Sequence, residues 1–116
     1  KCSPNLYHAI SGSVYIRQNL GVNDEDIIHA VRYHTTGRTG MSLLEKIIYL
    51  ADLTSADRDY PDVDRMRRIV RQDLDEGMRE SLRFIIPDLI ERKLLLHPDT
   101  IEAYNEYFLP LLAAEN

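Results

Sequence analysis

The chain has 116 residues, which is enough for one compact domain and too few for two. Apolar residues make up 44% and charged residues 28%, as in ordinary soluble globular proteins, and no apolar run approaches the ~20 residues of a membrane helix. The net charge of −5 disfavours a nucleic-acid partner, because binding to a phosphate backbone requires a basic face. The single cysteine, Cys2, excludes an internal disulfide and, with no signal-peptide pattern, favours the cytoplasm.

Glycine, proline and capping residues divide the sequence into about six predicted helices, with no strand-like alternation of apolar and polar residues. In chain order the predicted helices are Leu6–Leu20, Asp24–His34, Ser42–Leu53, Asp62–Arg71, Leu74–Lys93 and a last one that starts at His97-Pro98-Asp99-Thr100 and runs to about Ala113. Gly21 is a typical stop for the first helix. The prediction is an all-α fold in a single domain, residues 1–116.

Local signals predict how several of these helices begin or break. Ser42 and Glu45 have the spacing of a capping box, and Asp99 and Glu102 repeat that spacing at the start of the last helix. Pro87 is expected to kink or split the fifth helix, because proline removes a backbone hydrogen bond.

Two histidines lie at informative positions on the predicted helices. At about 100° per residue, His34 ends the apolar stripe of its helix. A core histidine with a satisfied hydrogen bond is the favoured interpretation there, with a ligand as the alternative. His8 shares a stripe with Gly12, and glycine inside a helix costs about 1 kcal/mol relative to alanine. Close approach of another backbone or of a ligand would explain that glycine, and a tight helix crossing explains it equally well.

Asp52 lies just past the margin of the apolar stripe of its helix, about 40° from Ile48. A carboxylate near the core boundary needs a partner, because burying it unpaired is costly. One interpretation is a salt bridge with Arg58 or Lys46. The other is a metal ligand, since histidine nitrogen and carboxylate oxygen together suit iron, manganese, zinc or cobalt. The residues alone leave both interpretations open.

The arginines also allow two interpretations. Arg38 lies in the glycine-containing loop 35–40, where it could contact a phosphate or be solvated. The arginines of segment 65–71 face Asp62, Asp64 and Asp73, so a solvated ion-pair helix is the favoured interpretation.

Several segments of the sequence match a known family pattern. They are residues 8–13 (HAISGS), 32–41 (RYHTTGRTGM), 43–52 (LLEKIIYLAD), Arg58 followed by 60–63 (YPDV), and 98–100 (PDT). Together they resemble the YqeK-type HD-domain phosphohydrolases, and the resemblance covers essentially the whole chain. It implies an all-α HD-domain helical bundle, of which this chain is the C-terminal part and lacks the N-terminal helices of the family.

The resemblance also implies an activity and a site. The implied activity is metal-dependent cleavage of diadenosine tetraphosphate, symmetrically to two ADP, by a metal-activated water that attacks a phosphoanhydride. The implied cofactor is a divalent or mixed-valence metal pair, iron first, with manganese, cobalt or zinc as alternatives. The expected partner is a dinucleoside polyphosphate or ADP, with no nucleic acid and no membrane. By motif, the implied metal ligands are Asp52 (also catalytic), His8 and His34, and the implied substrate-binding residues are His8, His34, Thr35, Arg58, Leu95, Leu96, His97, Pro98, Asp99 and Thr100. The segment formed by the last six would hold the nucleotide, and its helix start offers free N–H groups to an anion.

The sequence departs from the family pattern in two ways. It contains no adjacent His-Asp pair, which the family carries in N-terminal helices that would precede Lys1. Ser55 and Ala56 stand where the family commonly has glutamate and proline, so a carboxylate near Arg58 is missing. We therefore expect the lone chain to be impaired and to need the N-terminal helices of the same family domain, from its own or another chain; a homodimer is one such arrangement. The alternatives are an HD phosphohydrolase that acts on another nucleotide and a catalytically incomplete nucleotide-binding module.

Overall fold

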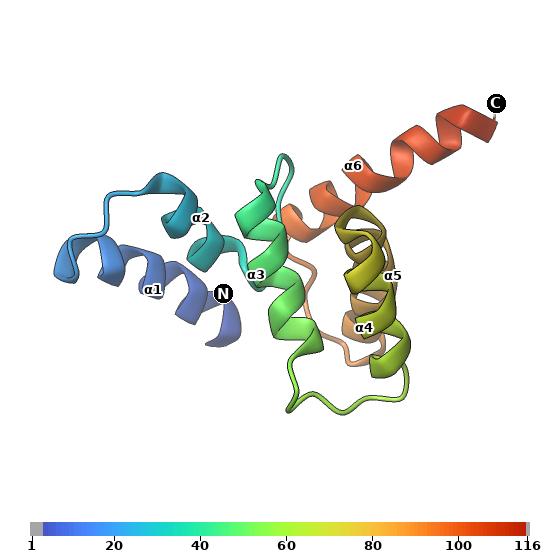
Figure 1. The fold of residues 1–116 in the computed structure, drawn as a ribbon, viewed down its shortest axis with the longest axis horizontal. Helices are drawn as coiled ribbons and strands as arrows, with labels where there is room; N and C mark the ends of the chain where they lie inside the picture. Colours follow the sequence, from blue (N-terminus) through green and yellow to red (C-terminus); the bar gives the residue numbers. More distant parts are fainter. Residues whose placement is uncertain (1–3, 116) are drawn as a thin grey trace.

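The computed structural model describes residues 4–115 of the chain, with side chains described for residues 7–112. This part consists of six α-helices and contains no strand (Figure 1). The helices are α1 (Pro4–Asn19), α2 (Glu25–Tyr33), α3 (Leu43–Thr54), α4 (Val63–Gln72), α5 (Leu74–Glu91) and α6 (Pro98–Glu115). The all-α prediction is confirmed, and the predicted helix ends differ from the observed ones by no more than two residues.

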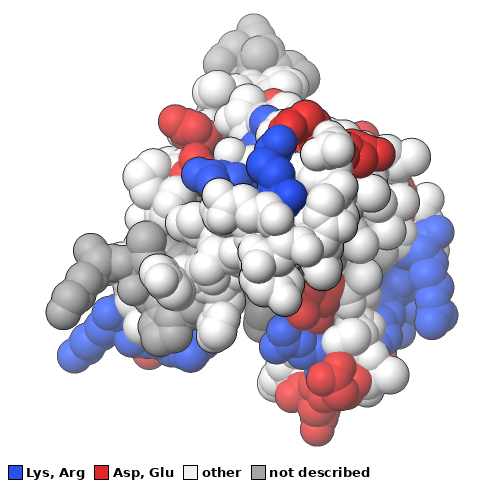
Figure 2. Space-filling view, turned by 90° about the vertical axis from the view of Figure 1, so that its left-hand side faces the viewer, with Lys and Arg blue, Asp and Glu red and all other residues white. Residues whose placement is uncertain are grey.

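The helices pack mainly on their neighbours in the sequence. Within the described residues, α1 packs on α2, α2 on α3, α3 on both α4 and α5, α4 on α5, and α5 on α6. The molecule is therefore elongated, 47 × 29 × 29 Å, with α1 and α2 at one end and the last turns of α6 projecting at the other (Figure 1). Seen from the end formed by α1 and α2, charged side chains of both signs lie in separate groups around a largely uncharged surface (Figure 2).

The core lies where α3, α5 and α6 meet. Its buried side chains are Met41, Tyr49, Leu50, Met78, Leu82 and Ala103. Leu50, Met78 and Leu82 have no exposed surface at all, and α4 and the start of α5 cover them with Val70 and Leu74. The face of α3 that carries Tyr49 and Leu50 thus packs into this core, whereas Leu43, Ile47 and Ile48 of the same helix are exposed.

Side-chain oxygens cap three of the helices. Ser42 Oγ accepts the N–H of Glu45 at 3.2 Å, and Asp73 caps α5 by accepting the N–H groups of Asp75 at 2.9 Å and of Glu76 at 3.2 Å. Asp24 caps α2 in the same way, through the N–H of Asp26. Of the capping box predicted for Ser42 and Glu45, the bond from the Glu45 N–H to Ser42 Oγ is confirmed.

Two details of the helix prediction differ in the structure. Of the kink or split expected at Pro87, the split does not occur, since α5 runs unbroken from Leu74 to Glu91 with Pro87 inside it. Asp99 does not cap the last helix, because it lies inside α6 and donates its own N–H to Nδ1 of His97 at 3.1 Å. His97 is the capping residue, with a ring nitrogen in place of the usual side-chain oxygen.

Glycine at position 77 allows α4 and α5 to cross closely. A Cβ atom there would lie 3.0 Å from Val70 Cγ2 and 3.2 Å from Leu50 Cδ1. At Gly12 a Cβ would meet only Val31 Cγ1, at an ordinary 3.5 Å. No backbone approaches Gly12 closely among the described residues, so the contact there is a plain helix crossing.

We therefore expect opposite results from the same substitution at these two glycines. Gly77→Ala should lower the free energy of unfolding by about 1–2 kcal/mol, since overpacking outweighs alanine's better helix propensity. Gly12→Ala should be neutral or stabilise by up to about 1 kcal/mol. Urea unfolding followed by circular dichroism measures both, and an equal loss at the two positions would contradict the assigned crossing.

Candidate functional site

The loop between α2 and α3 carries two of the predicted site residues, His34 and Thr35. His34 ends α2 and is half-buried, with Nδ1 2.5 Å from the carbonyl oxygen of Val31. A carbonyl only accepts, so Nδ1 carries the proton and Nε2 is left as the acceptor of the neutral ring. The hydrogen bond expected of a core histidine is present, and the ring still has one nitrogen for a ligand.

The same loop is joined to the start of α6. Thr100 Oγ1 donates to the carbonyl oxygen of Thr36 at 2.8 Å, and both residues are buried. This bond links positions 64 residues apart in the sequence. Two of the predicted substrate-binding segments, 34–35 and 95–100, therefore lie next to each other in the fold.

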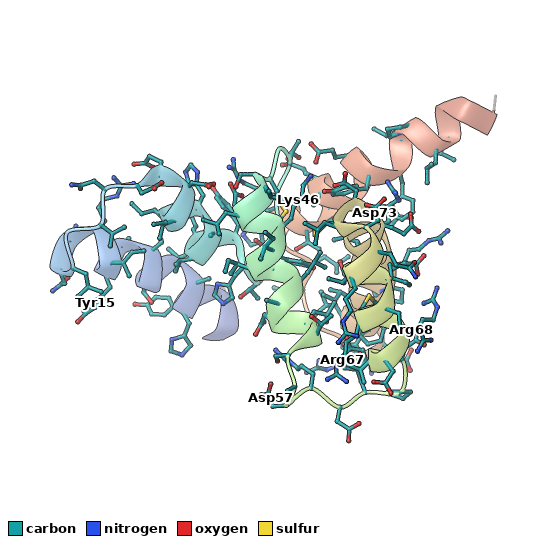
Figure 3. The ribbon with its side chains drawn as sticks, in the orientation of Figure 1. Tyr15, Lys46, Asp57, Arg67, Arg68 and Asp73 are labelled. Carbon is teal, nitrogen blue, oxygen red and sulfur yellow. The ribbon has the colours of Figure 1, made fainter. Side chains whose placement is uncertain are left out.

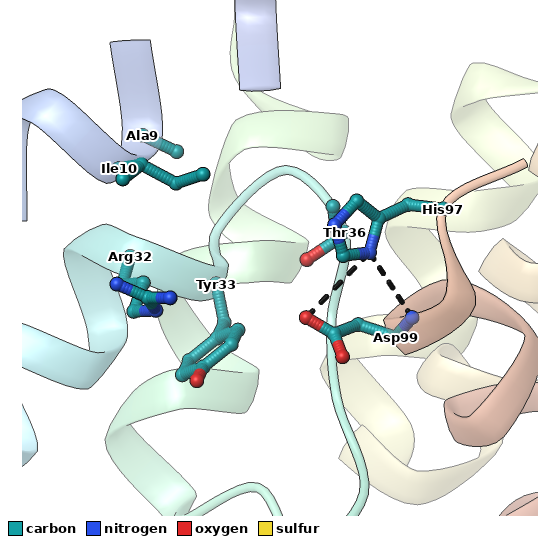
Figure 4. Close-up of a pocket in the computed structure, with 7 residues that line it drawn as sticks. All are labelled: Ala9, Ile10, Arg32, Tyr33, Thr36, His97 and Asp99. Carbon is teal, nitrogen blue, oxygen red and sulfur yellow. Dashed lines mark hydrogen bonds and ion pairs between the residues drawn. The ribbon is translucent and has the colours of Figure 1, made fainter. Parts of the chain in front are cut away.

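A cavity of about 50 Å³ lies at this junction. Figure 4 shows Thr36, His97 and Asp99 on one side of it and Ala9, Ile10, Arg32 and Tyr33 on the other. Ligand sites commonly enclose about 300–1,000 Å³, so this cavity can accept only a small part of a nucleotide. Of its lining residues, the sequence prediction named only His97 and Asp99. Arg32 and Tyr33 stand in the segment RYHTTGRTGM, which was the available signal for them.

The start of α6 does not offer free N–H groups. Pro98 has none, Asp99 donates to Nδ1 of His97, and the N–H groups of Thr100 and Ile101 reach the His97 carbonyl at 3.0 and 3.3 Å. The prediction of an anion site built from these groups is therefore wrong. Because Nδ1 of His97 accepts a hydrogen bond, its proton lies on Nε2, which becomes the donor available to a ligand.

The remaining residues of this segment differ in exposure. Leu95 is 79% exposed and Pro98 is exposed, whereas Leu96, His97 and Asp99 are half-buried. Asp99 Oδ2 lies 3.6 Å from His97 Nδ1. Nδ1 of His97 cannot serve both contacts at once. An ion pair with Asp99 requires a proton on Nδ1, whereas the capping bond from the Asp99 N–H at 3.1 Å requires Nδ1 to be unprotonated, as in the neutral ring.

Asp52 near the end of α3 is paired with Arg58. Arg58 Nη2 lies 3.3 Å from Asp52 Oδ2, and Arg58 Nε donates to the Asp52 carbonyl at 2.9 Å. Both side chains are about half exposed. Lys46, the other partner considered for Asp52, pairs instead with Asp75 at 2.8 Å. The salt-bridge interpretation of Asp52 thus holds in this structure, and its role as a metal ligand stays a prediction.

The segment after Asp52 is held by Arg67 of α4. Its guanidinium donates to the carbonyls of Thr54, Ser55 and Arg58 at 2.9–3.1 Å, and it also pairs with Asp64 at 3.0 Å. The solvated ion-pair interpretation therefore fits Arg65, which pairs with Asp62 and Glu80. Arg67 also forms the expected pair with Asp64, but its other hydrogen bonds go to backbone carbonyls and hold the preceding segment. Figure 3 shows Arg67 and Arg68 at the end of the molecule where the loop with Asp57 lies.

A carboxylate does lie beside Arg58 despite the departure at Ser55 and Ala56. Ser55 Oγ donates to Asp57 Oδ1 at 2.6 Å, and this bond, with a smaller contribution from the charge of Arg58, lowers the pKa of Asp57. Asp52 and Asp57 together give Arg58 an acidic environment. The Asp73 predicted to face the arginines instead caps α5.

Arg38 is paired with Glu45 and is neither a solvated arginine nor one free to bind a phosphate. Its Nε and Nη2 donate to the two carboxylate oxygens of Glu45 at 2.8 and 2.6 Å. Glu45 is 1% exposed. Burial alone would raise the pKa of Glu45, but the hydrogen bonds and charge of Arg38 hold it below its usual value.

The described residues do not complete a metal site. Among them, no group of three or more His, Cys, Asp or Glu side chains is arranged to hold a metal ion. His8 is exposed on α1, which does not pack on α3, the helix of Asp52. Ligation by His8, His34 and Asp52 stays a prediction.

In the described range, no helix is both long and apolar enough to cross a membrane.

No family model matches the chain. It is 42% identical over 104 residues to a symmetrical bis(5'-nucleosyl)-tetraphosphatase of Halalkalibacterium halodurans, covering 90% of this chain and 56% of the relative. It is 41% identical over 103 residues to the Bacillus subtilis protein of the same name, covering 89% and 55%. A crystal structure of a predicted HD superfamily hydrolase involved in NAD metabolism, from Clostridium acetobutylicum, superposes with a TM-score of 0.85 at 38% identity and covers 89% of this chain and 55% of that one.

The chain thus spans about half the length of the proteins it matches. Over that span both sequence and fold agree: the identity reaches 42% and the TM-score 0.85. The chain is therefore a partial-length relative of the symmetrical bis(5'-nucleosyl)-tetraphosphatases and has the fold of part of an HD-superfamily hydrolase.

Proposed function

We propose that this chain is one part of a hydrolase that splits diadenosine tetraphosphate, with one water, into two ADP. The observation that carries the proposal is the identity of 41–42% to two proteins named for this symmetrical reaction, over about 90% of the chain. The junction of the 34–36 loop with the start of α6 supports it. That junction gathers Thr36, His97 and Asp99 around one cavity, and the His34 ring keeps one nitrogen free of the hydrogen bond to Val31.

Within the proposal, the chain's own residues bind and orient the substrate. Nε2 of His97 can donate to a ligand oxygen, and Arg58 brings a guanidinium suited to bidentate phosphate contact. The net charge of −5 means that a polyphosphate needs such local cations. To contact phosphate, Arg58 must first break its half-exposed ion pair with Asp52 and then bind the substrate in its place.

A metal pair is also part of the proposal, with iron first among the metals considered. The described residues alone do not fit such a pair, because they hold no group of three ligands. We therefore assign no reaction step to a metal held by this chain alone. The missing ligands are proposed to come from further helices of the same domain, in the same chain or in a second copy, and the protein is proposed to work in the cytoplasm.

The test is to assay the product of the complete gene and the 116-residue chain side by side on diadenosine tetraphosphate, with chromatography of the products. The complete protein is expected to give ADP alone, two per substrate, and the 116-residue chain little or none. Equal amounts of ATP and AMP would overturn the symmetrical assignment. ADP binding without hydrolysis by the complete protein would favour the nucleotide-binding module instead.

Arg58→Ala in the complete protein should lower kcat/KM roughly 10–100-fold, the range for one lost hydrogen bond to a charged group. Arg92→Ala is the matched control, because Arg92 is also an exposed arginine 3.3 Å from an aspartate, Asp88. It should stay within about twofold of the unchanged protein. Steady-state kinetics measures both, and equal effects would remove Arg58 from the phosphate-binding role.

A further inference from the structure

We propose that the ion pair between the half-buried Arg38 and the buried Glu45 is a positioning pair, which fixes the loop residues 35–37 against the start of α6 and thereby sets the affinity of the cavity for nucleotide. This inference rests on the proposed function for its ligand. It assigns a role to two residues that touch neither the cavity nor the predicted ligands.

The main contacts of the Glu45 side chain lie outside its own helix. Ser42 caps α3 through the N–H of Glu45, and a hydrogen bond from the Ser42 backbone helps to lower the pKa of Glu45, but the hydrogen bonds and charge of Arg38 lower it more. The Glu45 side chain accepts from Arg38 with both oxygens, at 2.8 and 2.6 Å. It lies 1% exposed in a position where an apolar side chain would avoid the loss of hydration. Buried ion pairs are often no more stabilising than apolar replacements of similar volume, so a gain in stability does not explain this one.

The pair instead joins three segments. Arg38 donates from Nε and Nη2 to the two carboxylate oxygens of Glu45 in α3. Its guanidinium also lies 5.0 Å from the ring centre of Tyr33, the last residue of α2. Nη2 also lies 3.4 Å from Nδ1 of His29 on α2. Tyr33 lines the cavity, so Arg38 holds one cavity wall as well as its own loop.

The opposite side of the loop is held by α6. The carbonyl of Thr36 accepts from Thr100, and the N–H of Gly40 donates to Glu106 Oε2 at 2.9 Å. Gly37 has φ +70°, a conformation that residues with a side chain rarely adopt, and a Cβ there would lie at an ordinary 3.7 Å from Ala103, Met41 and Tyr49. The loop is thus clamped between Arg38–Glu45 on one side and α6 on the other. Releasing one clamp frees Thr35 and Thr36 to move.

The test compares two carboxylate-to-amide changes, each on an ion pair that includes one residue of α3. Glu45→Gln keeps the shape of the side chain and removes its charge. Asp75→Asn does the same to the Lys46–Asp75 pair, which joins α3 to α5 and, through Tyr107, to α6; none of these three residues belongs to the loop. Both are measured in the complete protein, at a temperature where circular dichroism shows each variant to be folded.

Glu45→Gln is expected to raise the Kd for ADP and the KM for diadenosine tetraphosphate about tenfold or more, with a smaller change in kcat, since displaced binding groups weaken substrate placement. Arg38→Lys should behave similarly, because lysine keeps the charge but cannot form the two-armed contact. Asp75→Asn should leave both constants within twofold. Unchanged constants in Glu45→Gln, or equal shifts in Asp75→Asn, would overturn the inference.

Amide hydrogen exchange separates this inference from the proposed function. The N–H of Gly37 donates to the carbonyl of Tyr33 at 2.8 Å, and it reports on the loop without any ligand. Glu45→Gln should speed its exchange about tenfold or more relative to amides of α5, whereas Asp75→Asn should not. If the complete protein neither binds nor cleaves nucleotides, the proposed function fails while this result still decides whether the pair positions the loop. Unchanged exchange at Gly37 would overturn the inference whatever the activity.

Discussion

Replacing Arg38 with methionine is expected to lower the free energy of unfolding by about 3–5 kcal/mol at neutral pH, because it leaves a buried carboxylate without its partner. Glu45 is 1% exposed and both of its oxygens accept from Arg38, so the substitution removes both of these hydrogen bonds from a buried carboxylate. The double variant Arg38→Met with Glu45→Met should recover most of the loss, since neither charge is then buried. Urea unfolding at pH 7 measures both.

The same pair predicts a pH dependence with a defined sign. The pKa of Glu45 is lowered by its contact with Arg38, so the pair stabilises the fold fully above the ordinary glutamate value of 4.5 and loses this effect as the pH falls through the lowered value. In Arg38→Met the carboxyl takes up a proton more easily. The stability difference between the variant and the unchanged protein should therefore shrink between pH 6 and the acid limit of folding. A difference that is constant with pH would show that Glu45 is not the group responsible.

Leu82→Ala should cost about 2–5 kcal/mol, through lost burial and the cavity left behind. Leu82 has no exposed surface and packs in the core with Leu50 and Met78, so the surrounding helices cannot easily close the gap. Leu95→Ala is the matched control, because Leu95 is 79% exposed and should change stability by less than about 0.5 kcal/mol. Thermal unfolding measures both changes. A similar loss at both positions would place Leu95 in an apolar contact that the described residues do not provide.

Helices could be predicted from the sequence because most of their ends depend on residues within one turn. Ser42 caps the N–H three residues on, and Gly21 adopts a φ of +68° just after α1. The start of α6 was misassigned because a neutral histidine can cap as well as a carboxylate, and the spacing of Asp99 and Glu102 does not reveal which one does. Pro87 does not split α5, because a helix packed against both α4 and α6 tolerates one missing backbone hydrogen bond.

The candidate site was less predictable because its contacts depend on the shape of a loop. Arg38 meets Glu45 across a turn whose path is set by positive φ angles at Gly37 and Gly40, and no residue spacing encodes that path. The bond from Thr100 to Thr36 joins segments separated by three helices. The positions of His34 at the end of an apolar stripe and of Asp52 just past the margin of one are local signals. Their joint role as ligands stays a prediction.

Among the helices of the described residues, α1 packs on α2 alone, and this has a thermodynamic consequence for ligand binding. A helix with so few neighbours can open as a separate cooperative unit, at a lower free energy than global unfolding, while the core of α3, α5 and α6 stays intact. Ala9 and Ile10 line the cavity from this helix. A ligand that touches both walls is therefore linked to the order of α1: it binds the closed form more tightly, and whatever holds α1 in place strengthens binding by the same factor.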